Sequence, residues 1–580
     1  MGYSMNWKKG LLLSTGLLIA LPLWPAPLTI TMEGINTDLQ QHVLSHLTLA
    51  AEQGRDEVLP SRLQRLHSQA LQEIKTALQV FGFYKAVVSG ELNQTVEGWA
   101  AHYRIEPGSA IPIGTLDVQI QGEGQSDTAL QNLLGNFALQ QGQPLEHPRY
   151  DLARDGLLRL AVERGYLDAA LRKHEVRVDL RAYTASVELQ LDTGKRYHFG
   201  AVQFSENNMK QTLLNRYVKF KQGDPYNPLE LLKLQTALSN SGYFQRVEVR
   251  PRQEKTAEDV VPIEVDLESR LPRQWRFGLG YASDTGPRGT LSHQRLMGNE
   301  GDKFQSDLLL SEKLRRIIAA YTIPLQDPIT EQLALALRFS NEITDSRDSY
   351  ITGVSLSYTS LWDDWRRTLS LNRDREVYVV ADQPEDTKQI FYPILSLDRI
   401  SADDRIRPRH GSRIHVEVRG ADETVLSDVS FLQLRSGLKW VGSMGSDGRV
   451  LLRADLGTTE VSDVNKLPAS QRFFAGGDNS VRGYAYEELG PKNALGVVVG
   501  GKHLIVGGIE LEQNLTKNWS SAVFYDVGNA INSTTESLLR GAGVGLRWKS
   551  PIGPVRMDFA WALDKPQDRF RLHIVIGPDL

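Results

Sequence analysis

From Arg273 to the end of the chain, apolar and polar residues alternate one by one, and this alternation restricts the fold more than any other feature. In the segment RIHVEVRG, residues 413–420, isoleucine and valine occupy every second position between arginine, histidine and glutamate. The segments FLQLRSGLKW (431–440) and GVGLRWKS (543–550) repeat the pattern. Successive side chains of a β-strand point to opposite faces, whereas an amphipathic helix needs a period near 3.6 residues. The second half of the chain is therefore predicted to consist of strands.

Two architectures accommodate many such strands. A soluble sandwich buries the apolar faces, whereas a transmembrane barrel turns them to lipid and lines a wet lumen with the polar faces. For one strand, both interpretations hold equally well. Fourteen or more strands, with turns between them and no helix to cover them, favour the closed barrel. Residues 274–580, at about 19 residues for each strand and its connection, predict sixteen strands, an even number as bacterial barrels require.

The N-terminus predicts export. Lys8 and Lys9 precede the apolar run of residues 10–24, which is followed by PAP. This order is typical of a secretory signal, here residues 1–26, and the run is short for an anchor helix, which needs about 20 apolar residues. The chain has no cysteine, which excludes disulfides and thiol chemistry, and its net charge of −4 does not indicate a nucleic-acid partner. We therefore expect a barrel in the cell outer membrane.

Before the barrel, one pattern occurs three times. A strand-like stretch is followed by an amphipathic helical stretch that ends in glycine and an aromatic residue; the glycines, 83 and 77 residues apart, are Gly82, Gly165 and Gly242. A repeat of this length is a small domain rather than a solenoid turn. The predicted modules are residues 27–108, 109–193 and 194–270, each a small sheet covered by helices. In the alternative interpretation, the apolar stripes serve only the cores of three small domains in a row.

A long connection, from about Asp463 to Gly501, contains the segment RFFAGGDNSVRGYAYEELG, residues 472–490. If the repeated modules are periplasmic, an even-stranded barrel places this connection on the extracellular side. Its aromatic residues would be poorly placed in solvent, so we expect the loop to fold back into the lumen. The candidate motif residues of this loop are Phe474, Gly476, Gly477, Val481, Arg482, Gly483 and Tyr484.

An arginine inside a narrow lumen needs a carboxylate, since an unpaired charge there is costly. In the segment VFYDVGNA, residues 523–530, the alternation turns Phe524 and Asp526 inward. The same parity turns Glu510 inward on the preceding predicted strand. We therefore expect Arg482 to form a forked pair with Asp526, with Glu510 close by, and we expect no metal or cofactor at this site.

These segments also resemble a known family. FFAGGDNSVRGY, FYDVGNA and GVGLRWKSPIGPVRMDFA are similar to the lid-loop motif and the last barrel strands of the BamA/TamA outer-membrane assembly superfamily, and the repeated modules resemble its POTRA domains. Three modules, the opening GLGYASDTGPR and the ending IGPDL resemble most the TamA branch, which supplies the barrel subunit of a translocation and assembly module. The resemblance covers essentially the whole chain after the signal. It implies three small α/β POTRA modules followed by a 16-stranded antiparallel transmembrane β-barrel.

The resemblance further implies a weakly paired seam between the first strand, at about 275–283, and the last, at about 569–577. The candidate seam residues are Gly278, Gly280, Ile574, Ile576 and Gly577. In the family such a seam is thought to open sideways, so that a client strand pairs with a free edge. The implied clients are unfolded outer-membrane proteins or autotransporters, which enter the outer-membrane lipid. The implied partner is a TamB-like periplasmic protein, anchored in the inner membrane and bound through the POTRA modules.

Three other functions account for parts of the sequence. A two-partner-secretion transporter, which exports a periplasmic client protein, shares the lid motif but usually has two modules and an N-terminal plug helix; this sequence has three modules and no amphipathic helix ahead of the first. A passive porin leaves the modules without a purpose. An enzyme is not indicated, because the sequence contains no G-x-S-x-G, H-E-x-x-H, Walker or EF-hand pattern and its twelve histidines form no ligand cluster.

Overall fold

The computed structural model describes residues 28–53, 59–95, 98–252, 259–404, 407–550, 553–565, 567 and 569–576. The predicted signal, residues 1–26, lies outside the described residues. The chain divides into two compact units. One unit comprises Met1–Ala201, Gln222–Leu229 and Arg252–Pro262, and the other comprises Val202–Lys221, Glu230–Pro251 and Ile263–Leu580. The second unit thus contains the barrel together with much of the third module.

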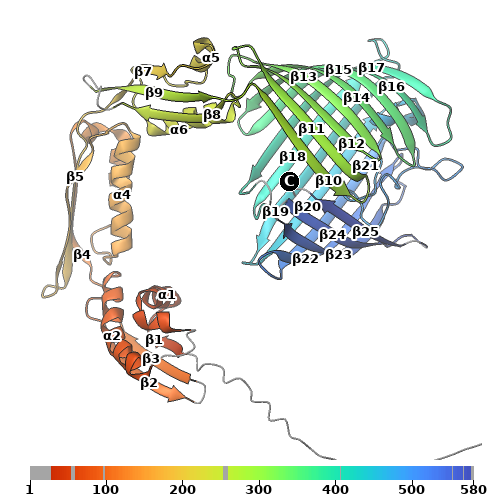
Figure 1. Cartoon of the computed structure of the whole chain (residues 1–580). Helices are drawn as coiled ribbons and strands as arrows, with labels where there is room; N and C mark the ends of the chain where they lie inside the picture. Colours follow the sequence, from red (N-terminus) through yellow and green to blue (C-terminus); the bar gives the residue numbers. More distant parts are fainter. Residues whose placement is uncertain are drawn as a thin grey trace, which may run out of the picture. The chain divides into compact units, whose positions relative to one another are not determined.

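Three small sheets precede the barrel (Figure 1). In the first sheet the middle strand is β3, which runs parallel to β1 and antiparallel to β2. The elements of this module are β1 (Leu28–Glu33), α1 (Thr37–His46), the 3-10 helix η1 (Thr48–Glu52), α2 (Pro60–Gln79), β2 (Val87–Thr95) and β3 (Gly98–Glu106). Helix α2 buries Leu63, Ile74 and Leu78 in the module core. These residues recur near the helical period, so one stripe of α2 faces the sheet.

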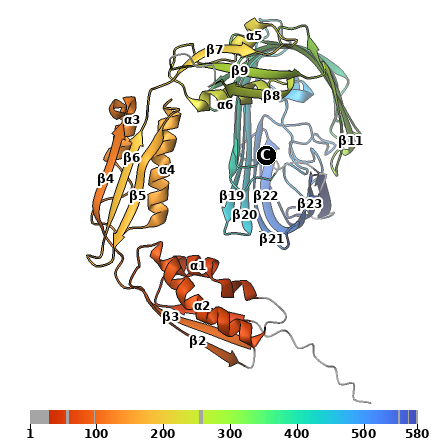
Figure 2. The same ribbon diagram turned by 60° about the vertical axis from the view of Figure 1, so that its left-hand side comes forward.

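The second and third modules repeat this plan. In both, the last strand in sequence lies in the middle of the sheet, in the orders β4-β6-β5 and β7-β9-β8. Their elements are β4 (Ile113–Gln121), η2 (Glu123–Ser126), α3 (Thr128–Gly135), α4 (His147–Glu163), β5 (Ala170–Asp179) and β6 (Thr184–Asp192), then β7 (His198–Phe204), α5 (Gln211–Asn215), α6 (Pro228–Asn240), β8 (Phe244–Pro251) and β9 (Val260–Ser269). Figure 2 shows α4 lying along its sheet. No helix of the described residues is both long and apolar enough to cross a membrane.

The glycine that follows each long helix also lies close to the next domain. Gly82, Gly165 and Gly242 have φ values of +86°, +94° and +79°, in the left-handed region that favours glycine and ends a helix. A Cβ on Gly82 would lie 2.5 Å from the carbonyl oxygen of Leu145, and a Cβ on Gly165 would lie 2.6 Å from that of Tyr226. At all three positions the glycine permits the helix end, and at Gly82 and Gly165 it also permits the close approach of the following module.

The rest of the chain forms a closed barrel of sixteen strands, as the alternation predicts. Neighbours in sequence pair antiparallel, and β10 meets β25 to close the ring. The strands are β10 (Arg273–Ala282), β11 (Gly286–Met297), β12 (Asp302–Ser311), β13 (Leu314–Pro324), β14 (Gln332–Ile343), β15 (Arg347–Trp362), β16 (Trp365–Val380), β17 (Asp386–Ala402), β18 (Gly411–Ala421), β19 (Phe431–Met444), β20 (Gly448–Glu460), β21 (His503–Asn514), β22 (Trp519–Ile531), β23 (Leu539–Ser550), β24 (Gly553–Ala562) and β25 (Phe570–Ile576). The predicted fold class, three α/β modules and a sixteen-stranded barrel, is confirmed.

The two faces of the barrel wall differ in composition. On β22, the outward side chains of Val523 and Tyr525 are exposed, whereas Phe524 and Asp526 are buried inside. On β14, the exposed side chains of Leu335, Leu337 and Phe339 form one apolar row at every second position. An apolar outer face and a polar inner face suit a barrel in lipid.

The third module is attached to one rim of the barrel. The Tyr243 hydroxyl donates to the carbonyl of Gly301 at 3.0 Å, and Arg216 Nη1 donates to the carbonyl of Leu325 at 2.6 Å. Gly301 and Leu325 lie in the turns after β11 and β13, so these turns mark the module side of the barrel. Because strand direction alternates around the ring, the connection between β20 and β21 lies at the opposite rim.

Leu356→Arg is expected to destabilise the barrel more than Ser357→Arg does. Leu356 lies midway along β15 on the outer face and is 45% exposed, whereas the alternation turns Ser357 to the lumen. A charged side chain on the lipid face near the bilayer midplane costs about 2–4 kcal/mol. Urea unfolding of the protein in lipid vesicles measures the difference. Equal losses of unfolding free energy would contradict the assignment of the two faces.

Candidate functional site

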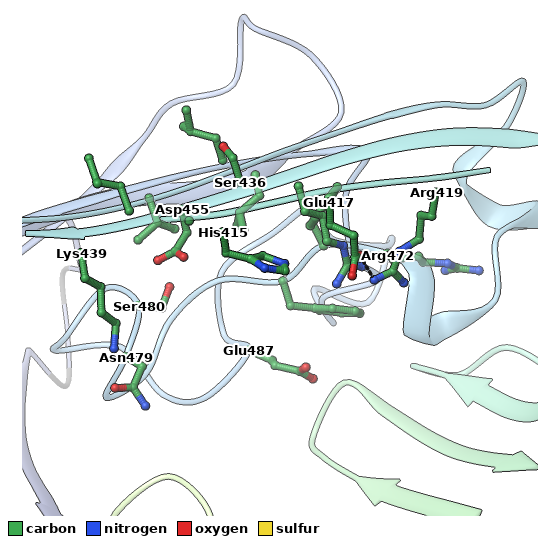
Figure 3. Close-up of a pocket in the computed structure, with 18 of the residues that line it drawn as sticks. His415, Glu417, Arg419, Ser436, Lys439, Asp455, Arg472, Asn479, Ser480 and Glu487 are labelled. Carbon is green, nitrogen blue, oxygen red and sulfur yellow. Dashed lines mark hydrogen bonds and ion pairs between the residues drawn. The ribbon is translucent and has the colours of Figure 1, made fainter. Parts of the chain in front are cut away.

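The connection between β20 and β21, residues 461–502, is here called the lid loop. It contains the short 3-10 helices η4 (Val464–Lys466) and η5 (Ala469–Gln471), and its motif residues Val481 and Tyr484 are buried. The loop turns into the lumen. Figure 3 shows its residues Asn479, Ser480 and Glu487 beside a cavity of about 730 Å³ that the inner faces of β18 to β20 also line.

Arg482 lies at the centre of a buried group of carboxylates. Its Nε and Nη2 donate to the two carboxylate oxygens of Asp526 at 2.7 and 3.1 Å, in the forked geometry that makes such pairs strong. Its Nη1 donates to Glu510 at 2.6 Å and to Asp558 at 3.2 Å. The guanidinium also lies over the ring of Phe524, 3.5 Å from the ring centre. One lid-loop side chain therefore contacts three strands, β21, β22 and β24.

Two further arginines balance these carboxylates. Arg547 on β23 pairs with Glu510 at 2.5 Å and with Asp558 at 2.6 Å, and Arg453 on β20 pairs with Asp526 at 2.9 Å. Burial of a charge is costly unless an opposite charge and hydrogen bonds compensate it. Three arginines and three carboxylates alternate in this cluster, so removal of any one leaves an uncompensated charge.

The charge of Arg482 persists at every pH the protein meets. Burial alone would lower the pKa of Arg482, but the adjacent carboxylates of Asp526, Glu510 and Asp558 raise it above its ordinary value. The lid loop is consequently held by a permanent charge, and its anchor does not depend on protonation of the arginine.

The glycines of the loop allow its backbone to lie directly against the barrel wall. Gly476, Gly477 and Gly483 have φ values of +100°, +107° and +97°, which disfavour other residues. A Cβ on Gly483 would lie 2.7 Å from the backbone nitrogen of Ala562 on β24. A Cβ on Gly541 of β23 would lie 1.9 Å from the carbonyl oxygen of Arg482. Substitution on either side of this contact would displace the loop.

A second anchor holds the lid loop to β15 and to the turn that precedes this strand. The carboxylate of Glu487 pairs with Arg347 at 2.8 Å and accepts from the hydroxyl of Ser346 at 3.0 Å. The guanidinium of Arg347 lies over the ring of Phe474, 4.9 Å from its centre. Glu487 has a φ of +59°, which is unfavourable for a non-glycine residue, so its ion pair holds a strained backbone in place.

The seam between β10 and β25 is the weakest junction of the barrel wall. Among the described residues, Ala282 and Val575 form its only registered pair, whereas β10 and β11 pair along the full length of β10. The backbone N–H of Ser283 donates to the carbonyl of Ile574 at 3.1 Å. On the module side of Ala282 the outward side chains of β10 are very exposed, with Leu279 at 94%.

The structure brings the predicted loop partners together. Arg482, Asp526, Phe524 and Glu510 meet in one cluster, as the strand parity predicts. The predicted seam residues lie at the junction itself: Gly278 and Gly280 face inward on β10 without a partner on β25, and Ile574 and Ile576 face outward on β25. Gly577 lies outside the described residues.

Sequence reasoning did not identify several members of the cluster. The alternation of side chains predicts that Arg547 on β23 and Asp558 on β24 point inward. It does not predict the strand register that brings them next to Glu510. The sequence also indicates no role for His573, which is only 1% exposed and accepts from the backbone N–H of Gly483 at 3.0 Å. The inward parity of β25 is the one signal that could have singled it out.

A barrel that closes at a weak seam, anchors a loop in its lumen and follows several α/β modules defines the class of outer-membrane β-barrels with POTRA domains. A family model described as "Omp85 superfamily domain" matches residues 287–579. Models described as "POTRA domain TamA domain 1" and "Surface antigen variable number repeat" match residues 29–107 and 197–270. The chain belongs to the Omp85 superfamily. It is an outer-membrane protein of the Gram-negative type, with its POTRA domains in the periplasm.

Two curated relatives carry the name outer membrane protein assembly factor BamA. The one from Neorickettsia risticii is 27% identical over 424 residues, which cover 67% of this chain and 54% of the relative. The one from Nitratidesulfovibrio vulgaris is 21% identical over 387 residues, which cover 63% and 48%. The chain thus spans about half the length of the curated relatives it matches.

Among solved structures, BamA from Haemophilus ducreyi lacking POTRA domains 1–3 has a similar fold. The TM-score is 0.66 at 16% sequence identity, and the match covers 80% of this chain and 99% of that one. At this level of identity the likeness supports the fold alone.

Arg482→Ala is expected to loosen the lid loop, because it leaves the carboxylates of Asp526, Glu510 and Asp558 with only two arginines. Breaking a buried pair costs up to about 3–5 kcal/mol, and lumen water makes this an upper value here. Hydrogen–deuterium exchange of the backbone amides of residues 461–502 measures the effect and should become faster.

Arg540→Ala is the matched control. Arg540 pairs with Asp564, but its side chain is 52% exposed, so loss of this pair should change little. Exchange in the lid loop should stay at the wild-type rate in this variant. If the lid-loop amides of Arg482→Ala were as protected as those of Arg540→Ala, the anchor would be wrongly assigned.

Proposed function

We propose that this protein assists the insertion or translocation of outer-membrane proteins, such as autotransporters, by opening the seam between β10 and β25. The single observation that carries the proposal is the incomplete ladder at this seam, where the described residues form one registered pair, Ala282 with Val575. Opening the wall there breaks few backbone hydrogen bonds. At β15 and β16, by comparison, the ladder continues along both strands.

The unpaired edge of β10 is suited to receive another strand. On the module side of Ala282, this edge presents backbone groups to the seam without a partner among the described residues of β25. An exposed strand edge is a template for pairing, and main-chain pairing tolerates many client sequences. The outward side chains of Phe277 and Leu279, which are 80% and 94% exposed, would lie beside the lipid-facing side chains of a client strand.

Within the superfamily, we infer a TamA-type subunit of a translocation and assembly module. The inference is supported by three modules before the barrel and by the match of residues 29–107 to the model for TamA domain 1. The proposed partner is a TamB-like periplasmic protein, anchored in the inner membrane and bound through the POTRA modules. The proposed mechanism exchanges one strand pairing for another and assigns no catalytic residue, metal or cofactor to this chain.

A disulfide between cysteines at Ala282 and Val575 is expected to block client insertion reversibly. Side chains of a registered antiparallel pair are about 4.5–5.5 Å apart at Cβ, close enough for a disulfide after a small adjustment. The natural chain has no cysteine, so the engineered bond forms without competition. Insertion of a client barrel into proteoliposomes, measured before and after reduction, tests the proposal.

The matched control places the cysteines at Thr290 and Leu309, a registered pair within the continuous ladder of β11 and β12. This bond should leave insertion unchanged. Full insertion by the oxidised seam variant would rule out opening between β10 and β25. A client that reaches the medium in soluble form, rather than the bilayer, would favour a two-partner-secretion transporter instead.

A photo-reactive residue in place of Glu91 is expected to crosslink the TamB-like partner. Glu91 is exposed on β2, an edge strand of the first module, and an edge strand can accept a strand from a partner. The same residue at Thr535, which is exposed in the turn between β22 and β23 at the opposite rim, serves as the control. Absence of a specific product at the first position would count against docking through this edge.

A further inference from the structure

A cluster of four residues joins the lid loop to both strands of the seam; it is here called the seam clasp. Its members are Ser283 and Asp284 in the turn after β10, Asp478 in the lid loop and His573 on β25. Asp478 accepts from the Ser283 hydroxyl at 2.8 Å and from the Asp284 backbone N–H at 3.4 Å. Asp478 also makes a short contact with His573 Nδ1, and its backbone N–H makes a short contact with the Asp284 carboxylate.

The clasp also reinforces the seam itself. The Ser283 hydroxyl accepts from the backbone N–H of Ile574 on β25 at 3.2 Å while it donates to Asp478. Next to the single registered pair of Ala282 and Val575, these contacts form a large part of the described connection between the first and last strands. Movement of Asp478 out of the lumen would therefore remove contacts from both edges at once.

The hydrogen bonds of His573 define its role in the clasp. Its Nε2 accepts from the backbone N–H of Gly483 at 3.0 Å, so the proton of the neutral ring lies on Nδ1 and points to Asp478. The side chains of Asp284, Asp478 and His573 lie close enough to ligate a metal ion together. However, the lone pair that a metal needs on Nδ1 is taken by this proton, and loss of the proton would leave the ring anionic. The geometry favours a proton site over a metal site.

Asp284 is the member of the clasp with one unpaired carboxylate oxygen. The residue is 7% exposed, and its Oδ1 has no hydrogen-bond partner in the part of the chain that the structure describes. A second carboxylate, that of Asp478, lies beside it. A buried carboxyl next to another carboxylate is stabilised when it is protonated, because the proton removes the repulsion and supplies a donor.

Other charged groups around Asp284 come from several elements. Arg571 and His573 on β25 act on its carboxyl together with Asp478. The cavity that Asp284 lines also contains titratable or charged side chains from β11, β18, β19, β24 and the lid loop, namely Arg288, Arg413, Lys439, Arg556, Tyr486 and Glu487. The cations in this set moderate the charge of Asp284, whose Oδ1 nevertheless has no hydrogen-bond donor among the described residues.

We propose that the seam clasp is strengthened by acid: a proton on Asp284 fastens the lid loop to both strands of the seam, and its release at higher pH eases seam opening. This inference concerns the regulation of the proposed function and rests on it for its biological meaning. The conformation of the seam, however, is measured on the protein alone, without any client.

The direction of the pH effect follows from the proton affinity of the closed state. Burial, and then the charge of Asp478, raises the pKa of Asp284 to about 6, whereas a solvated carboxyl has a pKa of about 4. The closed seam therefore binds the proton more tightly than the open seam, and this contribution is lost as the pH rises through about 6. The ratio of closed to open seams should increase about tenfold from pH 8 to pH 5.

Spin labels on the outer face measure this ratio. Cysteines at Leu279 on β10 and Leu572 on β25 carry the labels, because both side chains point away from the clasp and the chain has no other cysteine. Electron–electron distances are recorded in proteoliposomes at the urea concentration that opens half of the seams at pH 8. At pH 5 the long-distance population, which represents the open seam, should fall from half to about one tenth of all molecules.

Two variants separate the clasp from other pH effects. Asp284→Asn mimics the protonated carboxyl, so its seams should be closed at pH 8 as fully as wild-type seams at pH 5, with no further change on acidification. Asp307→Asn is the control, since Asp307 faces the lumen on β12 and contacts Gln305, away from the seam. In the Asp307→Asn variant, the ratio of closed to open seams should depend on pH as it does in the wild type. A wild-type ratio that is independent of pH, or an Asp284→Asn variant that titrates like the wild type, would overturn the proposal.

The proposal and the proposed function fail in distinguishable ways. If the label distances change with pH as expected but the protein with the disulfide-locked seam still inserts clients, the acid-strengthened clasp is supported and insertion through the seam is refuted. If the disulfide-locked seam blocks insertion but the label distances are independent of pH, insertion through the seam is supported and the acid-strengthened clasp is refuted.

Discussion

Inside a bilayer, every backbone N–H and C=O group needs a partner within the protein, and this requirement governs the whole structure. Sixteen strands meet it by closing into a ring. The ring is complete everywhere except at β10 and β25, where the described residues form one registered pair. A strand edge with unpaired backbone groups is costly in lipid. Either other contacts must keep the seam closed, or the edge must pair with another strand. The lid loop and the seam clasp serve the first purpose, and client pairing is the proposed second.

Charge compensation replaces secondary structure in holding the lid loop. The loop has only short 3-10 helices, yet it is fixed at two places by buried ion pairs, Arg482 with its carboxylates and Glu487 with Arg347. Asp478 lies four residues before Arg482 and forms the clasp. The anchor in the lumen and the clasp at the seam are thus parts of one short turn. Displacement of this turn would release the base of the loop and the seam together, which couples the two events mechanically.

Much of the fold could be predicted from the sequence because its signals are local. Alternation indicates the strands, and the helix-ending glycines mark the modules; both are confirmed by sixteen strands and three sheets. Parity also turns Asp526 and Glu510 toward Arg482. Parity did not reveal that Asp558 and Arg547 belong to the same cluster, because that depends on the register of β23 and β24 around the closed ring. Nor did it reveal that the third module and barrel share contacts, which depend on turn positions.

The sequence by itself determined the period of each segment, the inward or outward direction of its side chains and the presence of a glycine-rich loop with one arginine. These properties follow from steric and hydrophobic preferences among neighbouring residues. Only the tertiary structure decided which groups meet. In the clasp, Asp478 contacts residues 194 positions before it and 95 positions after it. Contacts at such separations depend on the closure of the ring and the path of the loop, which no local pattern encodes.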